Sequence, residues 1–354
     1  MMGREHIRNI SCLPETSIVG ICEPDPEMRK LAKLISPDAE FFESLQSLLK
    51  NMQFDCLVVA TPNFQHIDDL YEILKHTNKP ILIEKPIVTT LEDTRKLIDF
   101  SKKYQAPIWV AMEYRYMPVL QHFIREGALV TGGVKMLSIR EHRFPFLTKV
   151  NNWNRFNKYT GGTFVEKCCH FFDLMRLIIG CNPVQIMASG GQACNHLKET
   201  YDGSQSDIWD NGYVIVDFEN GARCMLELCM FADGAIYQEE ISAVGPKGKI
   251  ECKIPGPKRF WKNGKTQHPE SMIVTSDRKT KTVKEKIISV DSALLDLGDH
   301  NGSTFYQHEK FNDVVSSGNG VEVTVEDGIW AVKMGLAAQL ASIENRSVRM
   351  SEFL

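Results

Sequence analysis

The chain has 354 residues, of which 43% are hydrophobic and 24% charged, and its formal net charge at pH 7 is −4. This length exceeds one ordinary core and predicts two domains. The slightly acidic balance argues against nucleic acid or an anionic membrane as the main partner, because both favour basic patches. No stretch approaches the roughly 18 apolar residues of a membrane span, and the N-terminus has no apolar core of the secretory kind.

Short apolar runs alternate with amphipathic stretches over the first third of the chain. The predicted strands are 18–22, 56–60, 81–84 and 108–112, and the predicted helices are 26–34, 66–74 and 91–104. Strands and helices in alternation are typical of a parallel, doubly wound sheet with right-handed crossovers. We therefore expect an α/β domain over residues 1–117.

Two of these predicted strands end in turns with polar side chains. Ala60-Thr61-Pro62-Asn63 closes the second strand, and Glu84-Lys85-Pro86 closes the third. Proline cannot continue the strand ladder and keeps the residue before it extended. Thr61, Asn63 and Lys85 are therefore expected at the carboxyl edge of the sheet, where open α/β folds bind ligands.

The pattern changes after Pro118 and predicts an α+β domain over residues 118–354. The predicted strands are 135–143, 184–189, 213–218, 223–230 and 239–244, and the predicted helices are 119–126, 162–179, 303–316 and 325–345. The sheet is expected to be mostly antiparallel, and Asn220-Gly221 predicts a type I′ hairpin within it. Residues 255–276 are the best candidate for a mobile loop, and the basic run 278–286 is expected to be a solvated strand or loop.

Glu166, His170 and Asp173 lie in the predicted helix 162–179 at positions i, i+4 and i+7, which share one helical face. With the ammonium of Lys85, they would form a pocket equipped to move a proton off a hydroxyl. A single histidine on an apolar helix is usually structural, and the joint pattern is what favours function. No ligand quartet with zinc spacing accompanies Cys168-Cys169, so no metal site is expected. The ten cysteines, none spaced as CxxC, are typical of reduced side chains in a cytoplasmic protein.

In this order and spacing the chain resembles the glucose-fructose oxidoreductase and inositol dehydrogenase family (Gfo/Idh/MocA) over nearly its whole length. The motifs that carry the resemblance are Cys22-Glu23-Pro24-Asp25, Ala60-Thr61-Pro62-Asn63 with His66, Glu84-Lys85-Pro86, Gly161-Gly162 with Glu166, His170 and Asp173, and the closing stretch 311–349. The resemblance implies an N-terminal Rossmann domain that binds NAD or NADP. It also implies a C-terminal domain whose open sheet supports a homo-oligomer, and a site beside the nicotinamide lined by Lys85 and His170.

Three departures from the family pattern stand out. Glu166 replaces a common aspartate, and Glu113-Tyr114-Arg115 stands where many members have Asn-Arg. Gly3 resembles the third glycine of the G-x-G-x-x-G motif, whose strand and first two glycines are absent. We expect that loss to expose the edges of strands 18–22 and 56–60, and we expect the chain to be a fragment, splice product or gene model of a longer enzyme.

The resemblance and the residue chemistry together assign roles. His170 is expected to be the general base, Glu166 its orienting acid, and Lys85 the group that holds the reacting oxygen. The expected cofactor contacts are Gly3, Glu23, Thr61, Asn63, His66, Glu84 and Lys85, and Glu23 favours NAD over NADP by repelling a 2′-phosphate. The expected substrate contacts are Arg115, Trp153, Asn154 and Asp173.

The leading hypothesis is an NAD(P)-dependent dehydrogenase that acts on a CH–OH group of a sugar, polyol or cyclic alcohol. A second hypothesis is a non-catalytic binding or dimerisation protein, because the phosphate-binding glycine loop is incomplete. A third is the use of bound NAD without net turnover, to eliminate or hydrolyse a glycosidic bond by transient oxidation. The sequence does not name the substrate.

Overall fold

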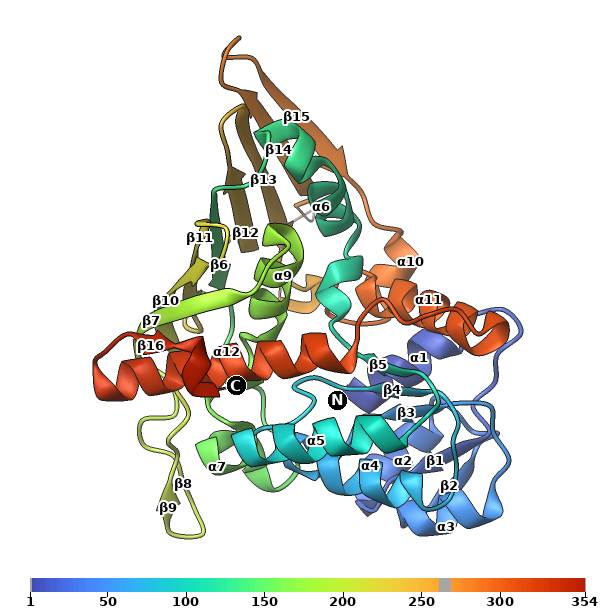
Figure 1. Ribbon diagram of the computed structural model, residues 1–354. Helices are drawn as coiled ribbons and strands as arrows, with labels where there is room; N and C mark the ends of the chain where they lie inside the picture. Colours follow the sequence, from blue (N-terminus) through green and yellow to red (C-terminus); the bar gives the residue numbers. More distant parts are fainter. Residues whose placement is uncertain (1, 261–268, 354) are drawn as a thin grey trace.

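The computed structural model of the chain describes residues 2–260 and 269–353. A smaller α/β domain lies beside a larger domain that is built on one long, open sheet, and the long helix α12 (Val325–Glu344) runs between them (Figure 1). Helices α11 (Ser303–Ser317) and α12 pack against the first domain, so the C-terminal part of the chain returns to it. The two-domain α/β plus α+β architecture expected from the sequence is confirmed.

The first domain holds two parallel sheets rather than one. Its strands are β1 (Gly20–Cys22), β2 (Glu40–Phe42), β3 (Leu57–Val59), β4 (Ile81–Ile83) and β5 (Ile108–Val110). β1 pairs with β2, and β3, β4 and β5 pair in that order, all in parallel. β1 and β3 therefore each have one edge without a strand partner in the described part of the chain, as expected for these two strands.

The helices of this domain begin where the sequence provides caps. They are α1 (Met2–Ile10), α2 (Pro26–Lys33), α3 (Leu45–Asn51), α4 (His66–Leu74) and α5 (Leu91–Lys103). The Asp25 carboxylate accepts the first backbone N–H groups of α2, and the Thr90 hydroxyl caps α5 in the same way. β4 and β5 are buried apolar runs, as expected of parallel strands covered on both faces. This packing holds the carboxyl ends of β4 and β5 in place.

The second domain is organised by a nine-stranded sheet in the order β15-β14-β13-β12-β6-β11-β10-β7-β16, in which only β6 and β11 are parallel neighbours. Its strands are β6 (Met136–His142), β7 (Pro183–Gly191), β10 (Asn211–Phe218), β11 (Arg223–Cys229), β12 (Tyr237–Val244), β13 (Gly248–Pro255), β14 (Ser271–Asp277), β15 (Val283–Ile288) and β16 (Val348–Arg349). A short separate hairpin is formed by β8 (Thr200–Tyr201) and β9 (Ser204–Gln205). The mostly antiparallel sheet expected from the sequence is confirmed.

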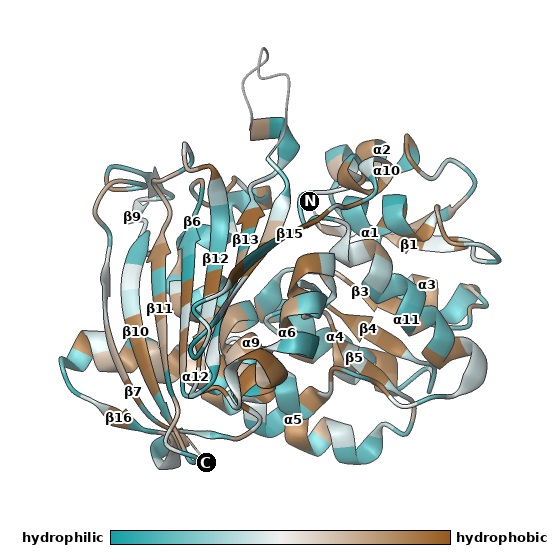
Figure 2. Ribbon diagram, turned by 90° about the horizontal axis from the view of Figure 1, so that it is seen from above, coloured by the Kyte–Doolittle hydropathy of each residue, from teal (hydrophilic) through white to brown (hydrophobic). Residues whose placement is uncertain are grey.

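Helices cover one face of this sheet and leave the other open (Figures 1 and 2). The helices of this domain are α6 (Pro118–Thr131), α7 (Asn157–Thr160), α8 (Thr163–Glu166), α9 (Cys169–Ile179), α10 (Ser292–Leu295), α11 (Ser303–Ser317) and α12. α6 packs on β13, α12 packs on β7, and α9 packs on α12. α11 packs instead on α1, which ties the end of the chain to its beginning.

The single helix expected over residues 162–179 is wrong. Gly161 and Gly162 have φ angles of +76° and +93°, and the chain then forms the short α8 and the separate α9. Lys167 and Cys168 lie between the two helices. Glu166 and His170 therefore do not share one helical face, which removes the geometric basis for their expected contact.

Smaller differences concern a turn and the loop after β13. The hairpin between β10 and β11 is confirmed, but only Gly221 has a positive φ, +76°, so the turn is not type I′, which needs two such residues. β14 forms at the end of the predicted mobile loop, and β15 forms in the basic run; β13 was not predicted. β15 is largely exposed, as expected for the basic run. Part of the loop predicted over 255–276 lies outside the described residues.

Candidate active site

Lys85 follows β4 directly and lies against the end of α8. Its Nζ is 3.5 Å from the backbone oxygen of Glu166. The Glu166 carboxylate accepts a hydrogen bond from Lys149 Nζ at 3.2 Å and another from the side-chain amide of Asn63. Asn63, a predicted cofactor contact, is thus bonded to a predicted catalytic acid. Glu166 anchors the turns around Lys85, and it is not the orienting partner of His170.

His170 lies in the first turn of α9 and is 2% exposed. Its Nε2 is 3.6 Å from Glu113 Oε1, and its Nδ1 has no hydrogen-bond partner in the described part of the chain. The Tyr114 ring stacks on the imidazole, with ring centroids 4.2 Å apart and planes 6° apart. Glu113 and Tyr114 therefore border His170, and its Nδ1 is a buried nitrogen without a hydrogen-bond partner in the described residues.

The electrostatic setting keeps Lys85 charged and His170 neutral. Burial lowers the pKa of His170 well below its usual value, and the neighbouring Lys85 ammonium lowers it further. Burial also opposes the charge on Lys85, but the surrounding acidic groups, Cys169, Glu166 and Glu113 among them, raise the pKa of Lys85. A neutral imidazole beside an ammonium is suited to accept a proton while the ammonium stabilises the oxygen that loses it.

Arg115 and Asp173, both predicted substrate contacts, bind each other. Arg115 Nε donates to Asp173 Oδ2 at 2.6 Å, and Arg115 Nη1 donates to the Glu322 backbone oxygen at 3.0 Å. Asp327 of α12 lies 3.5 Å from the same guanidinium. Their charges are compensated inside the protein, where the pair joins α9, α12 and the turn after β5, and their contact with substrate stays a prediction.

His66 and Glu84, expected at the cofactor, are also engaged by the protein. The His66 ring is fully buried, and its two nitrogens lie 3.0 and 3.1 Å from the backbone oxygens of Pro86 and Thr61. Glu84 Oε1 is 2.8 Å from His6 Nε2. These contacts stabilise the loops that carry Lys85 and leave His66 without a nitrogen for a ligand.

The side chains of Thr61, Trp153 and Asn154 also make contacts within the protein. The Thr61 hydroxyl donates to Asp69 at 2.6 Å, and the Asn154 amide donates to the Leu147 backbone oxygen at 2.9 Å. Trp153 lies under the Lys149 ammonium, which is 4.4 Å from the ring centroid. Trp153 therefore borders the Lys149–Glu166 cluster, whereas the Asn154 side chain turns toward its own loop.

Among the residues expected to contact a dinucleotide, Gly3 and Glu23 are not fully bonded within the protein, and they fit that ligand. α1 begins beside the end of β3, and a Cβ added at Gly3 would lie 4.0 Å from Ala60 Cβ. The first-turn N–H groups of a helix have no helical acceptor and favour phosphate. Glu23 follows β1, is half-buried, and accepts one hydrogen bond, from the Asp25 backbone. Its carboxylate can bind ribose hydroxyls at that strand end.

Several side chains that complete the site have no role predicted from the sequence. They are Glu5, Glu113, Tyr114, Lys149 and His300. Glu113 could have been found, since it closely follows the strand 108–112, as Lys85 follows 81–84. No sequence signal would have joined His300 to Glu5, whose Oε1 lies 2.7 Å from His300 Nδ1 across 295 positions.

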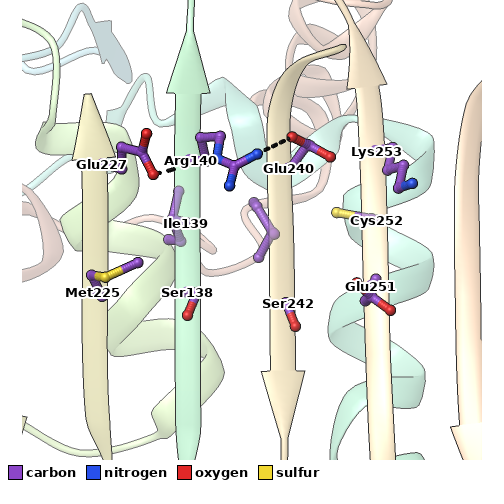
Figure 3. A pocket seen from close by; sticks show the side chains of 11 residues that line it. Ser138, Ile139, Arg140, Met225, Glu227, Glu240, Ser242, Glu251, Cys252 and Lys253 are labelled. Carbon is purple, nitrogen blue, oxygen red and sulfur yellow. Dashed lines mark hydrogen bonds and ion pairs between the residues drawn. The ribbon is translucent and has the colours of Figure 1, made fainter. Parts of the chain in front are cut away.

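A shallow depression of about 150 Å³ lies on the open face of the nine-stranded sheet and not at Lys85 or His170 (Figure 3). Arg140 spans it, donating to Glu227 at 3.3 Å and to Glu240 at 2.8 Å. Within residues 2–260 and 269–353, no group of three His, Cys, Asp or Glu side chains is arranged to hold a metal ion. No helix of that part of the chain is long and apolar enough to cross a membrane.

Comparison with known proteins gives relatives over the whole chain. Myo-inositol 2-dehydrogenase of Thermotoga maritima is 21% identical, with 100% of this chain and 97% of that protein covered. Rhizopine catabolism protein MocA of Rhizobium meliloti is 26% identical over 64% of this chain and 68% of its own. The match to YteT of Bacillus subtilis, at 27% identity, spans 49% of this chain and 42% of that protein.

Solved structures share the fold at lower identity. An oxidoreductase from Agrobacterium radiobacter, in complex with NAD+, L-tartaric acid and magnesium, has a TM-score of 0.78 at 15% identity, covering 100% of this chain and 96% of its own. An oxidoreductase domain protein from Kribbella flavida has a TM-score of 0.81 at 15% identity, covering 99% and 96%.

Family models cover nearly the whole chain. Residues 1–112 match the NAD-binding Rossmann fold of the oxidoreductase family GFO_IDH_MocA, and residues 124–350 match the C-terminal alpha/beta domain of the same family. The domain boundary expected at 117/118 falls between the two matched segments and stays a prediction. The reading as a non-catalytic binding protein gains no support. The chain is therefore an oxidoreductase of the Gfo/Idh/MocA family, with an NAD(P)-binding Rossmann domain followed by the family's C-terminal domain.

Proposed function

We propose that the protein oxidises a secondary alcohol of a polyol or sugar to a ketone, reversibly and with NAD as the preferred cofactor. The observation that carries this proposal is a buried, neutral imidazole at His170, whose pKa the nearby, half-buried ammonium of Lys85 helps to lower. The inositol dehydrogenases among the relatives support the polyol class, and the acid at Glu23 supports NAD.

The residues divide the work of removing the hydroxyl proton. Bound NAD would supply the hydride acceptor. Lys85 binds the reacting oxygen and stabilises its alkoxide character as the proton leaves. His170 receives the proton at Nδ1, while Tyr114 and Glu113 hold its ring. Glu166 does not act on the substrate: with Asn63 and Lys149 it positions the peptide whose oxygen faces Lys85 Nζ.

The direct test is turnover of cyclic polyols and sugars with NAD, followed by absorbance of the reduced nicotinamide. With myo-inositol as the first member of the panel, we expect activity that His170→Asn and Lys85→Met each reduce by about 10²- to 10⁴-fold. His122→Asn, on α6 and outside the site cluster, is the matched control and should behave as the wild type. Full turnover in His170→Asn would show that another group is the base.

The cofactor choice has its own test. If Glu23 reads the ribose, then Glu23→Gln removes the charge that repels a 2′-phosphate. We expect the ratio of kcat/KM for NAD to that for NADP to fall by about tenfold, which corresponds to about 1.4 kcal/mol. An unchanged ratio would mean that Glu23 does not contact the ribose.

We further propose that a second copy of the chain covers the open sheet face. Tyr213, Ile215 and Met225 are 56%, 43% and 37% exposed on this face, and they occupy neighbouring positions on the paired strands β10 and β11. Such a contiguous apolar row favours an interface. Sedimentation of the wild type against Ile215→Asp is the test, and a monomeric wild type would contradict it.

A further inference from the structure

Glu113 is a buried carboxylate without a partner. It is 1% exposed, and neither of its oxygens has a hydrogen-bond partner in the part of the chain that the structure describes. Its Oε1 lies 3.6 Å from His170 Nε2 and 3.8 Å from His300 Nε2. One oxygen atom therefore stands between two imidazole rings, and movements of about 0.5 Å would bring both distances near hydrogen-bond range. A structural carboxylate would instead be fully bonded, because a buried carboxylate without hydrogen bonds is destabilising.

His300 is bound firmly on its other side. Its Nδ1 lies 2.7 Å from Glu5 Oε1, and the Thr304 hydroxyl donates to the same oxygen at 2.9 Å. These contacts come from α1 and α11 and keep His300 Nε2 directed toward Glu113.

Exposure to solvent rises at the last group of this series, His300. The side chains of Glu113, His170 and His300 are 1%, 2% and 20% exposed, respectively. His300 is thus the member from which a proton can reach water, whereas His170 is enclosed. The three groups form a continuous path from the base to the solvent.

We propose that Glu113 and His300 form a proton relay that carries the proton taken up by His170 to solvent. The proposal rests on the proposed function, since the relay begins at the base of that reaction. Glu5 is a positioning residue of the relay. Glu113 and His300 act through His170 and do not need to touch the substrate.

Each step transfers one proton and leaves the charge balanced. As the substrate O–H bond breaks, an N–H bond forms at His170 Nδ1, and the proton on His170 Nε2 passes to the Glu113 carboxylate. The imidazole is then neutral again and the acid is protonated. His300, as the imidazolium, releases a proton to water and takes up the proton from Glu113. The hydride leaves with its electron pair to the cofactor, so that no further oxidant is required.

The charges around the relay suit this direction. Burial raises the pKa of Glu113, with Glu84 acting in the same sense and with His300 and Lys85 opposing. Burial lowers the pKa of His170, and Lys85, Lys167, His300 and Arg143 all act in the same direction. Burial alone would also lower the pKa of His300, but Glu5 and then Glu113 raise it to about 9, against Lys167. The most basic member therefore lies at the solvent end.

The first experiment needs no substrate. The full-length protein, labelled with ¹⁵N-histidine, is titrated by NMR between pH 5 and 10 as wild type, Glu113→Gln and Glu5→Gln. We expect His300 to titrate near pH 9 in the wild type and about one unit lower in each variant. We also expect neutral His170 to carry its proton on Nε2 in the wild type and to lose that preference in Glu113→Gln. Unchanged titration and an unchanged tautomer in Glu113→Gln would overturn the relay.

The second experiment measures transfer. We expect His300→Ala to lower kcat about tenfold with KM unchanged, and added imidazole to restore most of the loss, because a small buffer can replace a missing proton donor. Glu113→Gln should lower kcat without rescue, and His122→Ala should change nothing. A loss in His300→Ala that imidazole does not relieve would indicate a structural role and overturn the relay. If no polyol is turned over while the NMR coupling is present, the proposed substrate class fails and the relay stands.

Discussion

The contact between Glu5 and His300 makes the stability of the protein depend on pH in a predictable way. The pKa of His300 is about 9 in the folded protein, against the ordinary histidine value of 6.5 that applies in the unfolded chain. A folded pKa that is raised contributes stability fully present below pH 6.5 and lost as pH rises toward 9. The difference of about 2.5 units, at 1.36 kcal/mol per unit, corresponds to about 3 kcal/mol in the free energy of unfolding.

Urea unfolding followed by tryptophan fluorescence at pH 6.5 and pH 9.5 measures this term. We expect the wild type to lose about 3 kcal/mol more than His300→Gln over this interval, because the variant has no group that titrates at this position. Other groups titrate in both proteins and cancel in the comparison. Glu5→Gln should resemble His300→Gln, and the surface variant His122→Gln should resemble the wild type. Equal losses in wild type and His300→Gln would refute the reasoning.

Three further changes, with Lys30→Ala as a surface control, test the packing, each by urea denaturation. Asp173→Asn leaves the Arg115 guanidinium without its buried partner and should cost about 3–5 kcal/mol, whereas Lys30→Ala removes an exposed ion pair and should cost less than about 1 kcal/mol. Leu82→Ala empties a fully buried position in β4 and should cost about 2–5 kcal/mol. Gly335→Ala places a Cβ 2.7 Å from a backbone oxygen of α8 and should cost about 1–3 kcal/mol, and a neutral result would mean that α12 moves away from α8 freely.

Much of the first domain could be predicted from sequence because its signals are local. The apolar runs 81–84 and 108–112 became β4 and β5 within two residues, and helix 66–74 was confirmed at both ends. Such runs have few alternative secondary structures once prolines and helix caps mark their ends. β2 and α3 were missed between these signals, since a three-residue strand gives almost no pattern.

The helix around His170 shows where local pattern fails. Every residue from 163 to 179 is compatible with a helix, so the period does not reveal the break at Lys167 and Cys168. The Lys167 side chain bonds to the Tyr114 hydroxyl at 2.8 Å and to Glu141 at 2.8 Å, on another part of the site from Glu166. These are tertiary contacts, and they decide the conformation over local propensity.

The sequence could supply candidate residues for the site, but it did not predict which of them contact each other. The Lys85 ammonium lowers the pKa of His170, but the shared site that the family resemblance implied and the roles of both residues stay predictions. A sequence does not show whether a charged residue binds a substrate or another side chain. Arg115 and Asp173 bind each other, across 58 positions.

The contacts of α1 also have a consequence for how the protein is made. His6 binds His308 across 302 positions, and Glu5 binds His300 across 295. A ribosome releases the first domain's strands long before residues 300–308 emerge, so α1 must wait with Glu5 unpaired and with His6 bonded to Glu84 alone. Contacts at such separation form late and slow folding. The nascent first domain is therefore expected to be an open, protease-sensitive intermediate until α11 leaves the ribosome and completes it.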